Sequence, residues 1–201
     1  MILKVCGITN APDAEAALAA GANAIGFNFY PKSPRYIAPE RAAAIDTPGA
    51  RRVGVFVNED PLRITEIARI ARLDVAQLHG DEEVGKAVSP GGVALWKALR
   101  VGEGFSFELY RDLPVEALLL DGPAAELYGG SGRSFDWRVA ADSGRRIIVA
   151  GGLDASNVAR AIALARPWGV DACSRIESSP GIKDHRKMTE FLLAAREAQA
   201  A

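Results

Sequence analysis

Short apolar, β-branched runs alternate with longer Ala-, Leu-, Glu- and Arg-rich stretches along almost the whole chain. The runs are typical of buried strands, and there are eight: Ile2–Cys6, Ala24–Phe29, Arg52–Val57, Val75–Leu78, Ala94–Leu99, Ala117–Leu120, Ile147–Ala150 and Val170–Ala172. Four intervening segments have apolar residues three and four apart, which predicts helices over 13–20, 61–72, 156–166 and 185–198. Weaker helical patterns cover 82–88, 103–111 and 135–141.

This alternation predicts right-handed crossovers and a parallel sheet that is buried on both faces. Eight strand candidates in 201 residues favour a closed (βα)8 barrel, a short form of this α/β fold, over an open doubly wound sheet. The chain is 49% hydrophobic and has no visible linker, so we expect one domain over residues 1–201. In such a barrel the active groups lie where the strands end and the next loops begin.

Charge and cysteine usage exclude several classes of function. The net charge of −1 comes from interspersed acidic and basic residues, which argues against a nucleic-acid partner. No apolar run is long enough to cross a bilayer and no signal peptide precedes the first strand, so we expect a cytoplasmic protein with no membrane partner. A cytosolic setting argues against a structural disulfide between Cys6 and Cys173, and the spacing of His79 and His185 predicts no metal site.

A thiol and a carboxyl group stand at two of the predicted strand ends. Cys6 precedes Gly7 at the end of the first strand, although a lone cysteine beside an apolar run is more often an inert core residue. Asp121 ends the run Leu118–Leu120, where a carboxylate loses hydration unless it is paired or protonated. A capping bond to a nearby loop amide explains Asp121 equally well.

Three loops have the composition of binding sites. Arg35 follows two prolines in the loop after the second strand and is suited to a bidentate bond with a carboxylate, with surface solvation as the alternative. Gly151 and Gly152 close the seventh strand, where exposed backbone amides predict a phosphate cradle unless they form only a tight turn. The segment 129–134 has the composition of a mobile lid and does not match a P-loop.

Taken in order, several strings resemble the phosphoribosylanthranilate isomerase family. They are Lys4–Thr9, Phe29–Arg35, Gly54–Asn58, Gln77–Gly80, Leu120–Asp121, Gly129–Gly132, Phe135–Trp137 and Ala150–Leu153. Because their order and spacing extend across nearly the whole chain, the resemblance is specific.

The resemblance implies an Amadori rearrangement of N-(5-phosphoribosyl)anthranilate, a small phosphorylated substrate, without metal or organic cofactor. It implies that Asp121 protonates the furanose ring oxygen and opens the sugar to a Schiff base, and that Cys6 then removes the proton from C2′. An ordinary thiol, with a pKa of about 8.5, and an ordinary carboxyl, at about 3.9, are each in the wrong state at neutral pH. We therefore expect a coupled pair whose surroundings correct both pKa values.

The same resemblance assigns the remaining site residues. Arg35 faces the anthranilate carboxylate, and the other substrate-binding residues are His79, Asp171, Gly129 and Gly130. The phosphate-binding residues are Gly151, Gly152, Ser174 and Arg175. The chain departs from the family pattern here, because it reads Asp-Ala-Cys-Ser-Arg-Ile-Glu over 171–177 where the family usually reads Asp-Val-Ser-Ser-Gly-Val-Glu. The arginine either blocks the amide nest or adds a cation, and we expect retained phosphate binding with altered loop geometry.

Other functions fit the sequence less well. The related sugar-phosphate isomerase of histidine biosynthesis has an aspartate where Cys6 stands and a duplicated half-barrel, which we do not find here. A metal-dependent pentose-phosphate epimerase is disfavoured by the shortage of histidines. A non-catalytic phosphate-binding barrel is the alternative from another class. The sequence leaves both a monomer and a homodimer open.

Overall fold

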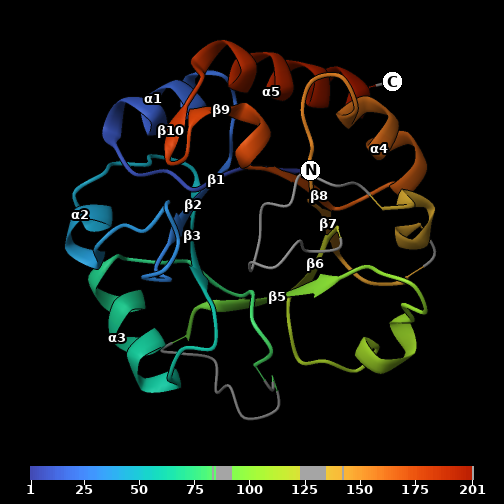
Figure 1. Cartoon of the computed structure of the whole chain (residues 1–201), viewed down its shortest axis with the longest axis horizontal. Helices are drawn as coiled ribbons and strands as arrows, with labels where there is room; N and C mark the ends of the chain where they lie inside the picture. The colour runs from blue at the N-terminus through green and yellow to red at the C-terminus, as the bar shows by residue number, and fades with distance from the viewer. Residues whose placement is uncertain (83, 85–91, 123–134, 142, 201) are drawn as a thin grey trace.

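Eight parallel strands form a closed barrel in chain order, and β8 pairs with β1 to complete the ring. We describe residues 1–82, 84, 92–122, 135–141 and 143–200 of a computed structural model. The barrel strands are β1 (Ile2–Cys6), β2 (Ala24–Asn28), β3 (Arg51–Phe56), β4 (Val75–Leu78), β5 (Ala94–Arg100), β6 (Ala117–Asp121), β7 (Ile147–Val149) and β8 (Gly169–Ala172). The prediction of a (βα)8 barrel is confirmed, with the helices around the outside of the strands (Figure 1).

Two of the helices begin at side chains that cap them. Asn10 accepts a bond from the backbone N–H of Asp13 at the start of the first helix, and Asp60 caps the third helix in the same way. The α-helices are α1 (Ala11–Ala19), α2 (Pro39–Ala43), α3 (Pro61–Ile70), α4 (Val158–Ala165) and α5 (His185–Ala200). Short 3-10 turns are η2 (Phe107–Tyr110), η3 (Trp137–Ala140) and η4 (Ser174–Ile176), and a hairpin joins β9 (Glu177–Ser179) to β10 (Ile182–Lys183).

Two of the weaker helix predictions were too long. The segments 103–111 and 135–141 contain only the single turns η2 and η3. Gly104 has a φ of 76° before the first turn and Gly144 has a φ of 65° after the second, so helical backbone stops at both positions. The pattern over 82–88 lies mostly outside the described residues. The sequence analysis also missed α2 and the β9–β10 hairpin, which are too short to show a periodicity.

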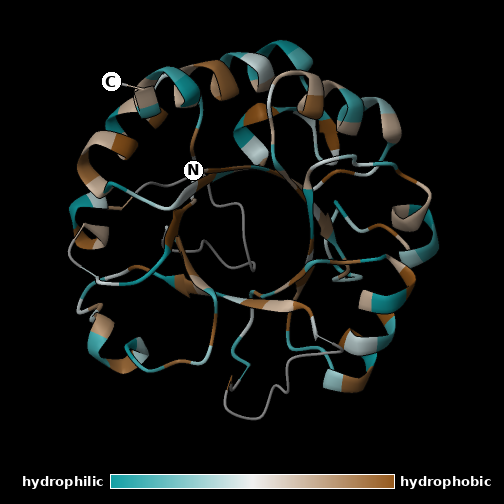
Figure 2. Ribbon diagram, turned by 180° about the vertical axis from the view of Figure 1, so that it is seen from behind, coloured by the Kyte–Doolittle hydropathy of each residue, from teal (hydrophilic) through white to brown (hydrophobic). Residues whose placement is uncertain are grey.

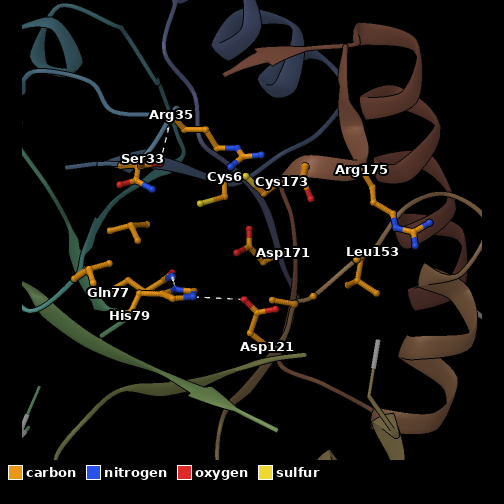
Figure 3. A pocket seen from close by; sticks show the side chains of 17 residues that line it. Cys6, Ser33, Arg35, Gln77, His79, Asp121, Leu153, Asp171, Cys173 and Arg175 are labelled. Atoms are coloured by element: carbon orange, nitrogen blue, oxygen red, sulfur yellow. Dashed lines mark hydrogen bonds and ion pairs between the residues drawn. The ribbon is translucent and has the colours of Figure 1, made fainter. Parts of the chain in front are cut away.

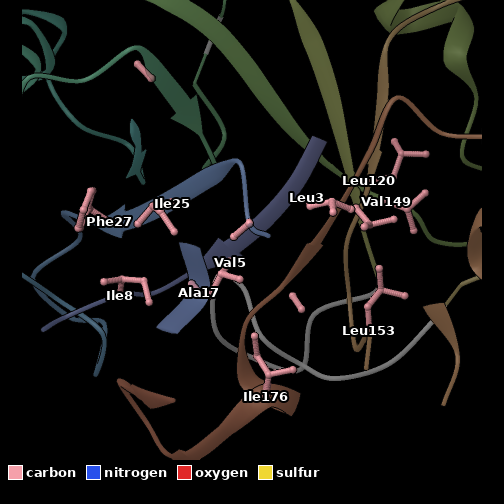
Figure 4. Packing of buried hydrophobic residues seen from close by; sticks show 14 of the residues in the cluster. Leu3, Val5, Ile8, Ala17, Ile25, Phe27, Leu120, Val149, Leu153 and Ile176 are labelled. Carbon is pink, nitrogen blue, oxygen red and sulfur yellow. The ribbon is translucent and has the colours of Figure 1, made fainter. Parts of the chain in front are cut away.

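Apolar side chains pack on both sides of the strands. One cluster fills the barrel interior and includes Val53, Val75, Trp96 and Leu119. A larger cluster lies between the strands and the surrounding helices, and Figure 4 shows part of it, with Leu3 and Val5 of β1 among residues of β2, β6, β7 and α1. Figure 2 shows the same arrangement from behind, with apolar strands inside a ring of helices whose outer faces are more polar.

The alternation of side chains along a strand determines which residues enter the barrel. On β1, Leu3 and Val5 pack outward against the helices, whereas Ile2 packs on the interior cluster. Lys4 and Cys6 share the phase of Ile2 and therefore point inward, with Cys6 at the carboxyl end. By the same rule Asp121 follows Leu119 on the interior side of β6. No described helix is both long enough and apolar enough to span a bilayer.

Candidate active site

A pocket opens at the carboxyl ends of the barrel strands, where sequence reasoning places the active groups. Its lining includes one or more residues from seven of the eight strands or from the loops that follow them. Figure 3 shows the side chains that point into it. They are Cys6, Asn28, Ser33, Arg35, Val55, Val57, Gln77, His79, Asp121, Ala150, Gly151, Gly152, Leu153, Asp171, Cys173, Ser174 and Arg175.

Cys6 lies on one wall of this pocket beside a buried ion pair. The side chain of Lys4 is fully buried, and its Nζ donates a 2.8 Å hydrogen bond to Asp171 Oδ2 on the neighbouring strand. The pairing of β1 with β8 sets Lys4 directly opposite Asp171. On the other neighbouring strand, a Cβ at Gly26 would lie 2.8 Å from Cys6 Sγ and 3.2 Å from Lys4 Cε, so a glycine is needed there.

The surroundings of Cys6 favour its thiolate. A hydrogen bond with the Cys173 thiol lowers the pKa of Cys6 well below its ordinary value. Burial opposes this change, and the Lys4 ammonium supports it. The pKa of Lys4 is itself raised, because the negative charges of Asp171 and Cys6 outweigh the effect of burial. The thiol at this position is thus prepared to act as a base near neutral pH.

Asp171 shares this wall and has an unusual protonation equilibrium. Burial, together with the negative charge of Cys6, raises the pKa of Asp171 to about 7, although the Lys4 ammonium opposes the shift. Within the described part of the chain, its Oδ1 atom is buried without a hydrogen-bond partner. Because Asp171 lines the pocket, that oxygen is suited to a ligand hydroxyl or amine.

Asp121 approaches the pocket from β6 and is mostly buried. Its Oδ1 accepts a 2.8 Å bond from the Gly122 backbone N–H, and its Oδ2 lies 3.4 Å from His79 Nε2. The amide nitrogen of Gln77 lies 3.0 Å from His79 Nδ1, and an amide nitrogen is a donor. In this arrangement Nδ1 faces the Gln77 amide, and Nε2 faces the carboxyl group of Asp121.

Arg35 is held at the rim by a carboxylate that sequence reasoning did not identify. Its Nε and Nη2 donate to both oxygens of Glu177 at 2.8 to 3.2 Å, and Glu177 also accepts a 2.9 Å bond from Lys183 Nζ. These bonds to Glu177 raise the pKa of Arg35 and keep it charged. The β9–β10 hairpin thus fixes the guanidinium beside Cys6 and Cys173 at the pocket wall.

The loops after β7 and β8 carry the predicted phosphate-binding residues. Gly151 and Gly152 both have positive φ angles, 79° and 67°, which only glycine adopts easily. Ser174 begins the turn η4, and Arg175 Nη1 donates a 3.1 Å bond to Asp154 Oδ2 in the loop after β7. The arginine therefore connects the two loops at the pocket mouth, and its side chain is about half exposed at 48%.

The structure brings most of the predicted site residues to one pocket. These are Cys6, Arg35, His79, Asp121, Gly151, Gly152, Asp171, Ser174 and Arg175. Gly129 and Gly130, with the rest of the predicted lid, lie outside the described residues. Sequence reasoning missed the parts played by Cys173, Lys4 and Glu177. The one available signal was Lys4, a charged residue in the middle of an apolar strand.

The chain is similar to one known family over nearly its whole length. Residues 3–194 match the family model described as N-(5'-phosphoribosyl)anthranilate (PRA) isomerase. A relative of that name from Solibacter usitatus (strain Ellin6076) is 70% identical over 201 residues, which is 100% of both chains. The crystal structure of phosphoribosyl anthranilate isomerase from Thermotoga maritima is 41% identical, with a TM-score of 0.88 over 98% of this chain and 100% of that chain.

A second solved structure of such an isomerase is in complex with reduced 1-(o-carboxyphenylamino)-1-deoxyribulose 5-phosphate. It is 38% identical, with a TM-score of 0.84 over 98% of this chain and 100% of that chain.

Proposed function

The chain belongs to the N-(5'-phosphoribosyl)anthranilate isomerase family, and from that premise we propose that Cys6 and Asp121 are its general base and general acid. The protein is an isomerase of tryptophan biosynthesis that converts N-(5-phosphoribosyl)anthranilate into 1-(2-carboxyphenylamino)-1-deoxyribulose 5-phosphate. One observation carries the assignment: both side chains line the same rim pocket, from β1 and β6. Family membership disfavours the histidine-pathway isomerase and the non-catalytic barrel.

The reaction needs one proton donor and one proton acceptor on different sides of the sugar. Asp121 gives a proton to the furanose ring oxygen as the bond from that oxygen to C1′ breaks, which leaves a protonated Schiff base. The positive imine nitrogen acidifies C2′, and the Cys6 thiolate removes the C2′ proton to give an enol amine. Tautomerisation of the enol amine yields the ketone. The lowered pKa of Cys6 supports its role as the base, because it favours the thiolate, the form that accepts a proton.

Three pocket residues are suited to holding the aromatic and sugar parts of the substrate. Arg35 presents a fixed positive charge for the anthranilate carboxylate, and its bonds to Glu177 use only Nε and Nη2. The unpartnered Oδ1 of Asp171 is available to a substrate hydroxyl or to the amine. His79 contacts the carboxylate of Asp121 and also lines the pocket, so it both positions the acid and borders the substrate.

The phosphate group fits the loops after β7 and β8. We place it against the backbone of Gly151 and Gly152 and beside Ser174, which together line that end of the pocket. Arg175 adds a cation there. Its guanidinium is bonded to Asp154, which lies in the same loop as the two glycines.

Substitution of the two proposed catalytic groups tests the assignment directly. We expect Cys6→Ser and Asp121→Asn each to lower kcat by about 10²- to 10⁴-fold, the range usual for loss of a general acid or base. Loss of the substrate's fluorescence measures the rate, and circular dichroism checks that each variant is folded. Asp112→Asn, an exposed carboxylate outside the pocket, is the matched control for Asp121→Asn. Near-normal rates in Cys6→Ser or Asp121→Asn would reject the roles.

The effect of Arg175 is tested by Arg175→Gly, which restores the usual family residue. If the arginine contributes charge to phosphate binding, the variant raises KM for the natural substrate by roughly tenfold, as expected for a lost charged hydrogen bond. The KM for an analogue without the phosphate should then stay unchanged. A lower KM for the natural substrate alone would mean that the side chain obstructs the phosphate loop.

The wider setting follows the sequence predictions. We propose that residues 1–201 form one catalytic domain that works in the cytoplasm on a small phosphorylated substrate, without metal, organic cofactor, nucleic acid or membrane. A monomer or a homodimer fits this proposal, and sedimentation equilibrium distinguishes them.

A further inference from the structure

The two cysteines of the chain, which lie 167 positions apart in sequence, meet at one edge of the pocket. Val5 pairs with Ala172 where β1 runs beside β8. The next residues are Cys6, which ends β1, and Cys173, which directly follows β8, so the two cysteines lie at the same height along the barrel. Neighbouring strands lie about 4.8 Å apart, and disulfides need Cα atoms about 4.4 to 6.8 Å apart. The two side chains also lie next to each other at the pocket wall (Figure 3), and a hydrogen bond from the Cys173 thiol is the main cause of the lowered pKa of Cys6.

We propose that Cys6 and Cys173 form a reversible disulfide when the enzyme meets a peroxide, and that this bond is an oxidation site that switches off the isomerase. Both thiols are free in the reduced protein. They line a pocket that is open to small molecules, so a peroxide reaches them by the route the substrate takes. Cytosolic disulfides are typically transient and redox-sensing rather than structural, which fits this position.

Positive charges around the pair favour the reaction. Lys183 Nζ lies 4.0 Å from Cys173 Sγ, and Lys4 lies beneath Cys6 on the same strand. The Arg35 side chain passes close to Cys173, because a Cβ at Gly7 would lie 2.8 Å from Arg35 Cδ and 3.1 Å from Cys173 Sγ. Cations beside a thiol stabilise its thiolate, the form that attacks peroxide.

The chemistry takes two balanced steps. The Cys6 thiolate attacks one oxygen of hydrogen peroxide, the O–O bond breaks, and the products are a sulfenic acid on Cys6 and hydroxide. The Cys173 sulfur then attacks the sulfur of that sulfenic acid, its own proton leaves with the departing hydroxyl as water, and the S–S bond forms. Peroxide is reduced and the two thiols are oxidised by two electrons in total. A dithiol such as dithiothreitol reverses the change by exchange.

Inactivation follows because the sulfur of Cys6 can no longer accept the C2′ proton. That consequence rests on the proposed role of Cys6, whereas the bond itself does not. A bound substrate fills the pocket beside both sulfurs, so we also expect the substrate or its product to slow the oxidation.

The test uses the full-length protein, treated with hydrogen peroxide and then with N-ethylmaleimide to block remaining thiols. We expect the intact mass to fall by two hydrogen atoms, with no thiol left to label and with no dimer formed. Activity should fall roughly a hundredfold or more, as for any loss of a general base, and dithiothreitol should restore it. Added oxygen atoms in place of lost hydrogens, or a loss that dithiothreitol does not reverse, would overturn the proposal.

Cys173→Ser is the matched variant, because a serine hydroxyl keeps a hydrogen-bond donor but cannot form the bond. The activity of the oxidised variant is compared with the activity of the same variant before peroxide treatment. We expect oxygen addition at Cys6 and incomplete recovery with dithiothreitol, since over-oxidised cysteine is not reduced by thiols. Recovery equal to that of the wild type would overturn a protective disulfide. If the wild-type bond forms but activity survives, the base assignment of Cys6 fails while the oxidation site stands.

Discussion

The two sides of the pocket hold their ionisable groups in different ways. On the β1–β8 side, the fully buried ammonium of Lys4 bonds to Asp171 at 2.8 Å, and the equally buried ammonium of Lys183 bonds to Glu177 at 2.9 Å. On the β4–β6 side, Asp121 contacts the imidazole of His79 at the longer distance of 3.4 Å. The carboxylate of Asp171 keeps the Lys4 ammonium charged in spite of its burial, whereas an imidazole carries charge only when it is protonated.

This difference matches what the proposed chemistry asks of each side. A base must be ionised before the reaction begins, so fixed cations beside Cys6 are useful. An acid must carry a proton that it can release, whereas a fixed cation beside a carboxyl group favours the ionised carboxylate. The β1–β8 wall thus holds fixed ammonium groups, and the β4–β6 wall places an imidazole beside Asp121. Each of the following experiments tests one part of that contrast.

The largest expected effect comes from removing the buried cation with Lys4→Met. The substitution leaves the carboxylate of Asp171 buried without its partner, and breaking a buried ion pair in this way costs about 3 to 5 kcal/mol of unfolding free energy. Urea denaturation measures the change. The matched control is Arg186→Met, which breaks the exposed pair with Glu190 and should change the midpoint little.

A double variant sharpens the same measurement. In Lys4→Met combined with Asp171→Leu no charge remains buried, so part of the lost stability should return. Equal losses of unfolding free energy in Lys4→Met and Arg186→Met would show that the buried ammonium of Lys4 stabilises the protein no more than an exposed ion pair does.

A smaller effect is expected from pH, through Asp171. Burial raises the pKa of Asp171 to about 7 in the folded protein, whereas an unfolded aspartate has a pKa of about 3.9. The folded state therefore holds this proton more tightly, so its contribution to stability is complete below about pH 4 and is lost as pH rises through about 7. Between about pH 4 and pH 7 the unfolding free energy should therefore fall with rising pH, by at most about 1.4 kcal/mol per pH unit.

Urea midpoints measured across the same pH range in Asp171→Asn test the source of that slope. In Asp171→Asn the unfolding free energy should depend less steeply on pH than in the wild type. Asp112→Asn, which changes an exposed side chain, should keep the wild-type pH dependence. An unchanged slope in Asp171→Asn would assign the pH dependence to another group.

The smallest effect is expected on the β4–β6 side. His79→Gln removes the imidazole contact with Asp121, and the loss of a polar interaction of about 1 kcal/mol lowers kcat roughly fivefold. The other histidine of the chain is a natural control, because His185 makes a similar contact with Asp13, 2.8 Å long, outside the pocket. His185→Gln should leave kcat unchanged. A loss in His79→Gln as large as that in Asp121→Asn would contradict a merely supporting role for His79.

The strands were predictable because their signal is local. Continuous apolar runs placed all eight barrel strands, with ends that differ from the structure by at most one residue. The helices of the weak segments were not predictable in the same way, since η2 and η3 are single turns whose ends depend on glycine φ angles. The hairpin β9–β10 contains few apolar residues, and its position is defined by ion pairs rather than by a pattern.

The candidate site was partly visible before the structure. Polar residues and glycines at strand ends indicated Cys6, Asp121 and the glycine pair Gly151–Gly152, because the ends of parallel strands gather at one rim. The sequence analysis treated Cys173 as unrelated to Cys6, and it had no means of pairing Arg35 with Glu177. Those contacts join residues 142 to 167 positions apart.

The sequence alone determined the eight barrel strands and the rim at which polar residues follow them. These follow from continuous apolar runs and from the direction of parallel strands, both of which are local properties. Only the tertiary structure decided which thiol, carboxylate and cation share a wall. Closure of the ring sets β8 against β1 in one register, and that register brings Asp171 to Lys4 and Cys173 to Cys6.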